Sequence, residues 1–117
     1  MLETKRLVIA QMIVCHGCCC GATQKNRPEV PVEWLKDEWR KRGLLKRFQL
    51  TMSGCVGPCD VPNVVVVNSK DGSQWLGSIT HFDQYRSLLE WAVRSVEAGY
   101  LMELPREFKD HRLEPWR

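Results

Sequence analysis

A chain of 117 residues has room for one domain with a single modest core, and no repeat period or low-complexity stretch indicates another architecture. Hydrophobic residues make up 44% of the chain and charged residues 26%, which is ordinary for a soluble globular protein. The formal net charge of +3 is too small to indicate nucleic acid as a partner.

The longest apolar run, residues 7–14, does not predict a membrane-spanning helix. It is interrupted by Gln11 and is far shorter than the roughly 18 residues needed to cross a bilayer. Two basic residues precede the run and Cys15 follows it, which is the order of a bacterial lipoprotein signal. The run is short for such a signal, and Val14 stands where a small residue is expected, so we do not adopt this interpretation. No contact with a membrane is therefore expected.

Residues 5–14 predict the first strand, because their apolar side chains follow one another too closely for a surface helix. This strand brings Cys15 to its C-terminal end. A long loop containing glycines and prolines follows and ends at Pro31. Between residues 31 and about 42 the apolar residues are spaced as on one face of a helix, and Gly43 predicts the end of that helix.

The middle of the chain predicts three more strands. Residues 48–52 alternate between apolar and polar side chains, as in a half-buried strand. Four consecutive valines, 64–67, predict a strand that is buried on both faces. Asp71 and Gly72 then turn the chain back into a further strand at residues 74–77.

The last regular element is predicted to be an amphipathic helix. Thr80 and Asp83 predict a capping box at its start, and Gly99 predicts its end. Residues 100–117 include two prolines and are expected to form a tail on the surface. The apolar face of the helix consists of Phe82, Tyr85, Leu88, Leu89, Ala92, Val93 and Val96.

The order strand, helix, strand, hairpin and helix predicts an α/β fold of the thioredoxin-like kind, with a four-stranded mixed sheet and two main helices. This domain is expected to span residues 1–99, followed by the tail at 100–117. Both segments that contain cysteines would then follow parallel strands. We expect them to meet at the same end of the sheet.

All six cysteines fall in those two short segments, 14–21 and 53–60. Their density is below the roughly 8–10% of small secreted disulfide scaffolds, and three consecutive cysteines are poorly placed to close disulfide loops. A reducing cytoplasm is therefore the expected location. Clustered cysteines in that environment indicate a metal site, either an iron–sulfur cluster or zinc.

The spacing of the cysteines resembles that of a known family. Cys15 and Cys20 form a C-x4-C pair, and Cys55 and Cys59 form a C-x3-C pair within S-G-C-V-G-P-C-D, followed by V-P-N-V-V-V-V. This pattern resembles the thioredoxin-like [2Fe–2S] ferredoxins, including the corresponding subunit of respiratory complex I, over roughly residues 6–98. It is also similar to small bacterial ferredoxin-like proteins, often associated with cobalamin biosynthesis, in its triple cysteine and its V-P-V-x-W-L-K helix start.

The resemblance implies that Cys15, Cys20, Cys55 and Cys59 bind a [2Fe–2S] cluster and that the protein carries one electron without catalysing a reaction. It also implies a redox partner protein, and it allows for a homodimer and for a role in cobalamin biosynthesis. Backbone N–H groups can stabilise the sulfurs of such a cluster where the chain approaches closely. Glycines at 17, 21, 54 and 57 would permit that approach.

Other ligand sets and metals remain open at this stage. Cys18 and Cys19 are extra to the family spacing, and either can replace Cys20 as a ligand. Cys15 and Cys18 also have the C-x2-C spacing of a zinc knuckle or of a thioredoxin redox motif. A zinc site would usually repeat this spacing in the second segment, and a redox motif would begin a helix at its first cysteine. His16 is a further candidate ligand, as in Rieske centres.

The second functional hypothesis is a metal-binding accessory module that delivers zinc, cobalt or nickel to a partner, and the surplus cysteines favour it. The sequence contains no Ser/His/Asp set, carboxylate pair or phosphate-binding loop, so no enzymatic activity is expected. Basic residues gather between 36 and 47 without interleaved aromatic residues. They are expected to form a solvated helix face rather than a nucleic-acid site.

Overall fold

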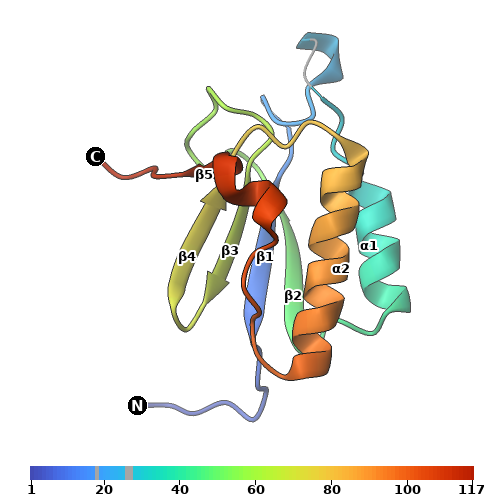
Figure 1. Ribbon diagram of the computed structural model, residues 1–117, viewed down its shortest axis with the longest axis vertical. Helices are drawn as coiled ribbons and strands as arrows, with labels where there is room; N and C mark the ends of the chain where they lie inside the picture. Colours follow the sequence, from blue (N-terminus) through green and yellow to red (C-terminus); the bar gives the residue numbers. More distant parts are fainter. Residues whose placement is uncertain (18, 26–27) are drawn as a thin grey trace.

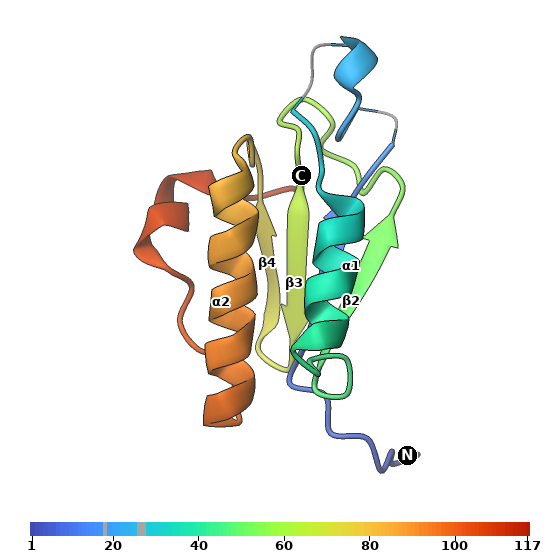
Figure 2. The same ribbon diagram turned by 90° about the vertical axis from the view of Figure 1, so that its right-hand side faces the viewer.

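Two helices lie on one face of a five-stranded mixed sheet (Figures 1 and 2). The computed structural model describes residues 1–17, 19–25 and 28–117. Within them, no helix combines the length and the apolar character that a bilayer crossing requires. The strands lie in the order β2-β1-β3-β4-β5. The elements are β1 (Ala10–Cys15), η1 (Thr23–Lys25), α1 (Val32–Lys41), β2 (Phe48–Ser53), β3 (Val65–Ser69), β4 (Gly72–Leu76), α2 (Phe82–Ala98), η2 (Arg106–His111) and β5 (Arg112–Leu113), where η marks a 3-10 helix.

Parallel pairing of β1 with β2 brings the two cysteine segments to one end of the sheet. Ala10 lies opposite Phe48 and Cys15 lies opposite Ser53, with α1 as the crossover connection. β3 pairs antiparallel with β1, and β4 pairs antiparallel with β3. The predicted order of elements and the predicted meeting of the two segments are both confirmed (Figure 1).

The main core lies between the sheet and the two helices. Ala10, Met12 and Val14 of β1 are all buried on this side, as the two-residue period of a strand requires. Trp39 of α1 is fully buried, and its indole N–H donates a hydrogen bond to the carbonyl oxygen of Phe48 at 2.9 Å. This large side chain therefore enters the core without leaving a donor unpaired.

A smaller apolar cluster lies on the opposite face of the sheet. Val65 and Val67 belong to the main core, whereas Val64 and Val66 belong to this second cluster. The prediction of a strand buried on both faces is thus confirmed. Ile13, Cys15, Cys20, Val56, Val61 and Trp75 complete the second cluster. The cysteine segments therefore pack on the face that the two long helices leave open.

The predicted start of α2 is wrong in its capping residues, whereas the predicted end is confirmed. Gln84 takes the role assigned to Asp83, because its Oε1 accepts hydrogen bonds from the backbone N–H groups of Thr80 and His81, both at 2.8 Å. The longer glutamine side chain can reach back over the first turn. Gly99 ends the helix in the left-handed conformation with φ of 84°, which glycine adopts without steric cost.

Two smaller expectations also need correction. The first strand begins at Ala10 rather than at residue 5, so the preceding apolar residues Leu7 and Val8 are exposed. The segment before α1, predicted as one long loop, also contains the short helix η1. A single turn of 3-10 helix is too short to produce an apolar period in the sequence.

The C-terminal segment is more than the predicted surface tail. Phe108 of η2 is 0% exposed and belongs to the main core. β5 pairs antiparallel with β4, where Leu113 lies opposite Trp75, and so adds a fifth strand to the four expected. Trp116 packs its ring edge-on against Trp75 with 5.5 Å between ring centroids. Residues 100–117 therefore contribute to both the core and the sheet.

Replacement of Phe108 by alanine tests this contribution. We expect Phe108→Ala to lower the free energy of unfolding by about 3–5 kcal/mol, because it removes a fully buried ring and leaves a cavity. The matched control is Trp116→Ala, which should cost less than about 1 kcal/mol because that side chain is 69% exposed. Urea denaturation measures both values. Equally small losses in the two variants would contradict the packing described here.

Two buried polar side chains of α2 provide a second test. Ser95 Oγ accepts a hydrogen bond from the backbone N–H of Met102 at 3.0 Å, whereas the Tyr85 hydroxyl lies beside the Asn63 side chain but makes no hydrogen bond of good geometry in the described part of the chain. We expect Ser95→Ala to cost about 1–3 kcal/mol of stability and Tyr85→Phe to leave stability unchanged or raise it. Denaturant titrations compare them. A loss above about 1 kcal/mol in Tyr85→Phe would show that its hydroxyl is hydrogen-bonded.

Candidate functional site

The ends of β1 and β2 hold the two cysteine segments together through backbone hydrogen bonds. The N–H of His16 donates to the carbonyl oxygen of Ser53 at 2.8 Å, which continues the parallel pairing one residue past Cys15. The N–H of Cys15 donates to the carbonyl oxygen of Val64 at 3.1 Å, so the start of β3 is tied to the same point. The sheet therefore fixes the backbone on both sides of the first cysteine.

Five of the cysteines line one small cavity between the two segments. Its empty volume is about 200 Å³, part of which is open to solvent. All four predicted ligands contribute to it, and so does Cys19; Cys18 lies outside the described residues. The lining residues are Cys15, Cys19, Cys20, Cys55, Val56, Gly57, Pro58, Cys59 and Val64. The structure thus brings together thiols from both predicted segments.

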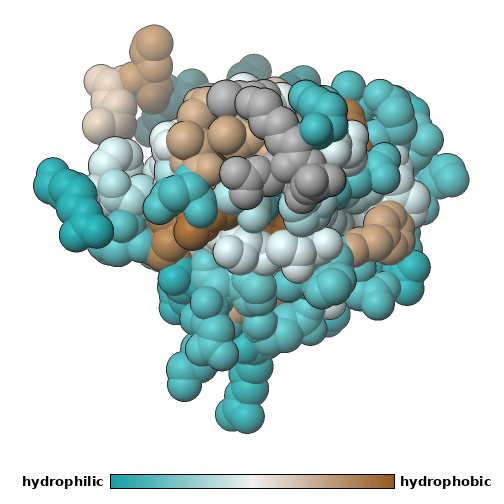
Figure 3. All heavy atoms as spheres, turned by 90° about the horizontal axis from the view of Figure 1, so that it is seen from above, coloured by the Kyte–Doolittle hydropathy of each residue, from teal (hydrophilic) through white to brown (hydrophobic). Residues whose placement is uncertain are grey.

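The two cysteine pairs differ in their exposure. Cys15 and Cys20 are 3% and 1% exposed, whereas Cys55 and Cys59 lie at the surface. Seen from this end of the molecule, a few exposed apolar side chains lie among hydrophilic ones (Figure 3). One pair therefore belongs to the interior and the other to the rim of the cavity.

Burial changes the chemistry of Cys15. It raises the pKa of the Cys15 thiol to about 12, and a hydrogen bond with Cys20, the charge of Cys20 and the charge of Cys55 act in the same direction. The backbone N–H of Val56 opposes this rise by hydrogen bonding to the Cys15 sulfur. Without a metal, Cys15 is therefore a protonated thiol at neutral pH. A bound cation would favour the thiolate instead.

The described donors of this site are thiols from both cysteine segments. Within residues 1–17, 19–25 and 28–117, no three His, Cys, Asp or Glu side chains come close enough together to hold one metal ion. A [2Fe–2S] centre requires only two protein thiolates on each iron, and the cavity offers thiols in two pairs. The side chain of His16 lies against Gly21 and does not line the cavity. The site is therefore a thiol site, suited to thiophilic metals.

Two glycines shape the backbone around the cavity. Gly21 has φ of 70°, and a Cβ atom there would lie 3.0 Å from Val30 Cγ2 and 3.1 Å from His16 Cδ2. Gly57 has φ of 125°, a backbone conformation that residues with a Cβ atom rarely adopt. Its carbonyl oxygen accepts a hydrogen bond from the N–H of Cys59 at 2.7 Å. Glycine is thus required in both segments for the chain to follow this path.

The sequence analysis did not identify Asn63, which connects the two segments. Asn63 is fully buried, and its Oδ1 accepts a hydrogen bond from the N–H of Gly21 at 2.8 Å. Its Nδ2 donates to the carbonyl oxygen of Pro28 at 3.0 Å. A polar residue at the start of the buried valine run was the available signal, because a buried amide needs partners.

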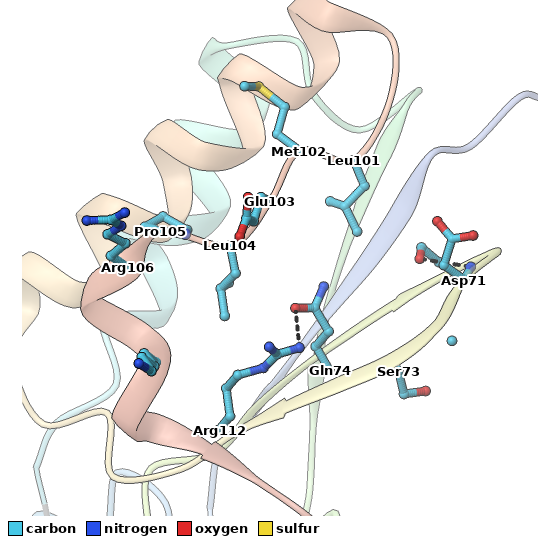
Figure 4. A pocket seen from close by; sticks show the side chains of 13 residues that line it. Asp71, Ser73, Gln74, Leu101, Met102, Glu103, Leu104, Pro105, Arg106 and Arg112 are labelled. Atoms are coloured by element: carbon cyan, nitrogen blue, oxygen red, sulfur yellow. Dashed lines mark hydrogen bonds between the residues drawn. The ribbon is translucent and has the colours of Figure 1, made fainter.

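A wider cavity lies elsewhere and has a different character. Its empty volume is about 1350 Å³, part of which is open to solvent, and it lies between the β3–β4 hairpin and the segment that precedes β5 (Figure 4). Arg106 and Arg112 line it together with Glu103 and Asp71, and Arg112 donates a hydrogen bond to Gln74 Oε1 at 3.3 Å. Its charges are mixed and it includes no cysteine. It is therefore separate from the thiol site.

Comparison with known proteins shows the fold. No protein-family model matches the chain, and no curated protein sequence matches it. Among solved structures, the crystal structure of the wild-type thioredoxin-like [2Fe–2S] ferredoxin from Aquifex aeolicus superposes with a TM-score of 0.53 and 18% sequence identity. The match covers 92% of this chain and 98% of that chain. The predicted fold class is therefore confirmed: the chain has a thioredoxin-like α/β fold.

Proposed function

We propose that this protein is a one-electron carrier that binds a [2Fe–2S] cluster through Cys15, Cys20, Cys55 and Cys59. The main support is the single cavity that thiols from two distant segments line at the end of two parallel strands. The fold shared with a [2Fe–2S] ferredoxin and the cysteine spacing of that family support the same assignment. We also propose that the protein has no substrate chemistry of its own.

The residues around the cavity suit this role. When bound, the cluster supplies one reversible electron transfer, at a potential set by burial and by hydrogen bonds to its sulfurs. The N–H of Val56 offers such a hydrogen bond to Cys15. Val64 shields the interior side, whereas Cys55 and Cys59 keep the other side at the surface. An electron partner can therefore approach over the second cysteine segment.

The biological setting is part of the proposal. We propose that the partner is a separate redox protein in the cytoplasm. On the strength of the sequence resemblance, we also propose that the protein serves cobalamin biosynthesis and assembles as a homodimer. The proposal includes no membrane or nucleic-acid partner.

The second candidate function is a metal-binding accessory module that delivers zinc, cobalt or nickel. The observation that favours it is Cys19, which lines the cavity in addition to the four proposed ligands. A fifth thiol can replace one ligand while the metal moves to a partner. Under this hypothesis the purified protein would be colourless with one zinc ion, or coloured by cobalt or nickel without inorganic sulfide.

Cysteine variants test the proposed ligand set. Anaerobically purified wild-type protein should contain about two iron and two sulfide ions, absorb visible light and give an EPR signal after reduction with dithionite. Cys20→Ser, Cys55→Ser and Cys59→Ser should each lose most of this iron, because an iron then lacks a thiolate. The matched control is Cys19→Ser, the neighbour of Cys20, which should retain it.

Iron and sulfide analysis distinguishes the outcomes. Loss of the cluster in Cys19→Ser would overturn the ligand assignment. Wild-type protein that carries one zinc ion and no iron, even after anaerobic reconstitution with iron and sulfide, would contradict the electron-carrier proposal and favour the accessory module.

A further inference from the structure

The side chain of Asn63 closes the loop that directly follows the first cysteine pair. Its two hydrogen-bond partners, Gly21 and Pro28, lie on either side of η1, while Asn63 itself lies just before β3. One amide thus joins the two ends of the loop to the strand beside the second cysteine segment. Its own carbonyl oxygen accepts a hydrogen bond from the N–H of Ile79 at 3.0 Å, which fixes its backbone as well.

These contacts require an amide. Gly21 offers a donor and Pro28 offers an acceptor, so the side chain must accept at one atom and donate at the other. Asn63 is 0% exposed, so water cannot replace a partner that is lost. An apolar side chain of similar size satisfies neither contact. An ionised carboxylate satisfies only the contact with Gly21.

The contact with Gly21 acts directly on Cys20. The N–H of Gly21 and the carbonyl group of Cys20 belong to one planar peptide group. That carbonyl oxygen accepts a hydrogen bond from the N–H of Gly17 at 2.9 Å, and the N–H on the other side of the group donates to Asn63. Both the N–H and the carbonyl oxygen of this peptide group are therefore hydrogen-bonded. The direction in which the Cys20 side chain leaves the backbone is fixed as a result.

We infer that Asn63 is a positioning residue that holds Cys20 at the ligand position of the first segment. The inference rests on the proposed function. Both Cys19 and Cys20 line the cavity, and the peptide group that Asn63 anchors is the one that follows Cys20, whereas the carbonyl oxygen of Cys19 accepts a separate hydrogen bond from the N–H of Ala22 at 3.3 Å. Asn63 does not itself line the cavity. It therefore influences a bound metal only through the backbone conformation at Cys20.

Thiol alkylation of the metal-free protein tests the positioning. Reduced, metal-free wild-type protein and Asn63→Ala are treated with iodoacetamide, and tandem mass spectrometry follows each cysteine. Cys20 should react about tenfold faster in Asn63→Ala, because loss of its anchor allows the loop to open locally. Cys55 is already exposed and should keep its rate, so it serves as an internal reference.

The matched control is Asn68→Ala. Asn68 lies on β3 and its Oδ1 accepts a hydrogen bond from Ser73 Oγ at 2.6 Å, away from the cysteine cavity. This variant should leave the alkylation of Cys20 unchanged. Asn63→Asp is the milder second variant, which retains an acceptor for Gly21. Circular dichroism checks that each variant is folded.

The loaded protein gives a second readout. In the wild-type background Cys19→Ser should leave the EPR spectrum unchanged. In the Asn63→Ala background the same substitution should alter it, because Cys19 then shares the ligand position with Cys20. A structural role alone would not create this dependence on Cys19.

Each outcome decides the inference. A folded Asn63→Ala variant in which Cys20 is as protected as in the wild type would overturn it. A uniform rise in the alkylation of all cysteines would also overturn the inference, because Asn63 would then stabilise the whole fold. Failure of both Asn63 variants to fold would overturn it for the same reason. If the wild-type protein binds no iron while the alkylation of Cys20 rises as expected, the proposed function fails but the positioning of Cys20 stands.

Discussion

The parallel pairing of β1 with β2 is the constraint on which the candidate site depends. Most of the described residues of the two cysteine segments lie outside helices and strands, and the two segments are far apart in the sequence. The sheet brings them together through its own hydrogen bonds. A chain of 117 residues can also bury a core of its own, unlike a zinc finger, whose folding free energy comes from the metal. The sheet therefore supports the buried side of the site.

The two cysteine pairs differ in exposure, so one side of the site is buried and the other side faces solvent. The interior pair lies among valines from β3 and its preceding residues, and water has little access to it. The surface pair lies on a loop that follows β2 and is shaped by Gly57 and Pro58. An electron carrier needs both properties, because a cluster must be protected and yet lie within reach of a partner. The burial of Cys15 and Cys20 and the exposure of Cys55 and Cys59 provide both.

Sequence patterns predicted the elements whose side chains repeat. The four valines 64–67 reveal a strand buried on both faces, and Gly99 marks the end of α2. Short or nonlocal features left no such pattern. β5 has two residues, so its pairing with β4 produces no alternation. The contacts of Asn63 join residues that are distant in the sequence, and only the folded chain brings them together. The four proposed ligands were predicted because their spacing resembles that of a known family. Cys19 also lines the cavity, which depends on the conformation of the loop and cannot be read from the spacing.

The position of the C-terminal residues has a practical consequence for anyone who attaches a probe to this protein. Trp116 and Arg117 share a groove with Val56, Gly57 and Pro58, so an affinity tag or fluorophore joined there would crowd the approach to the thiols. The first residues of the chain lie at the opposite end of the sheet (Figure 1). Attachment at that end keeps the surface around Cys55 and Cys59 clear for electrochemistry on an electrode or for capture of a binding partner.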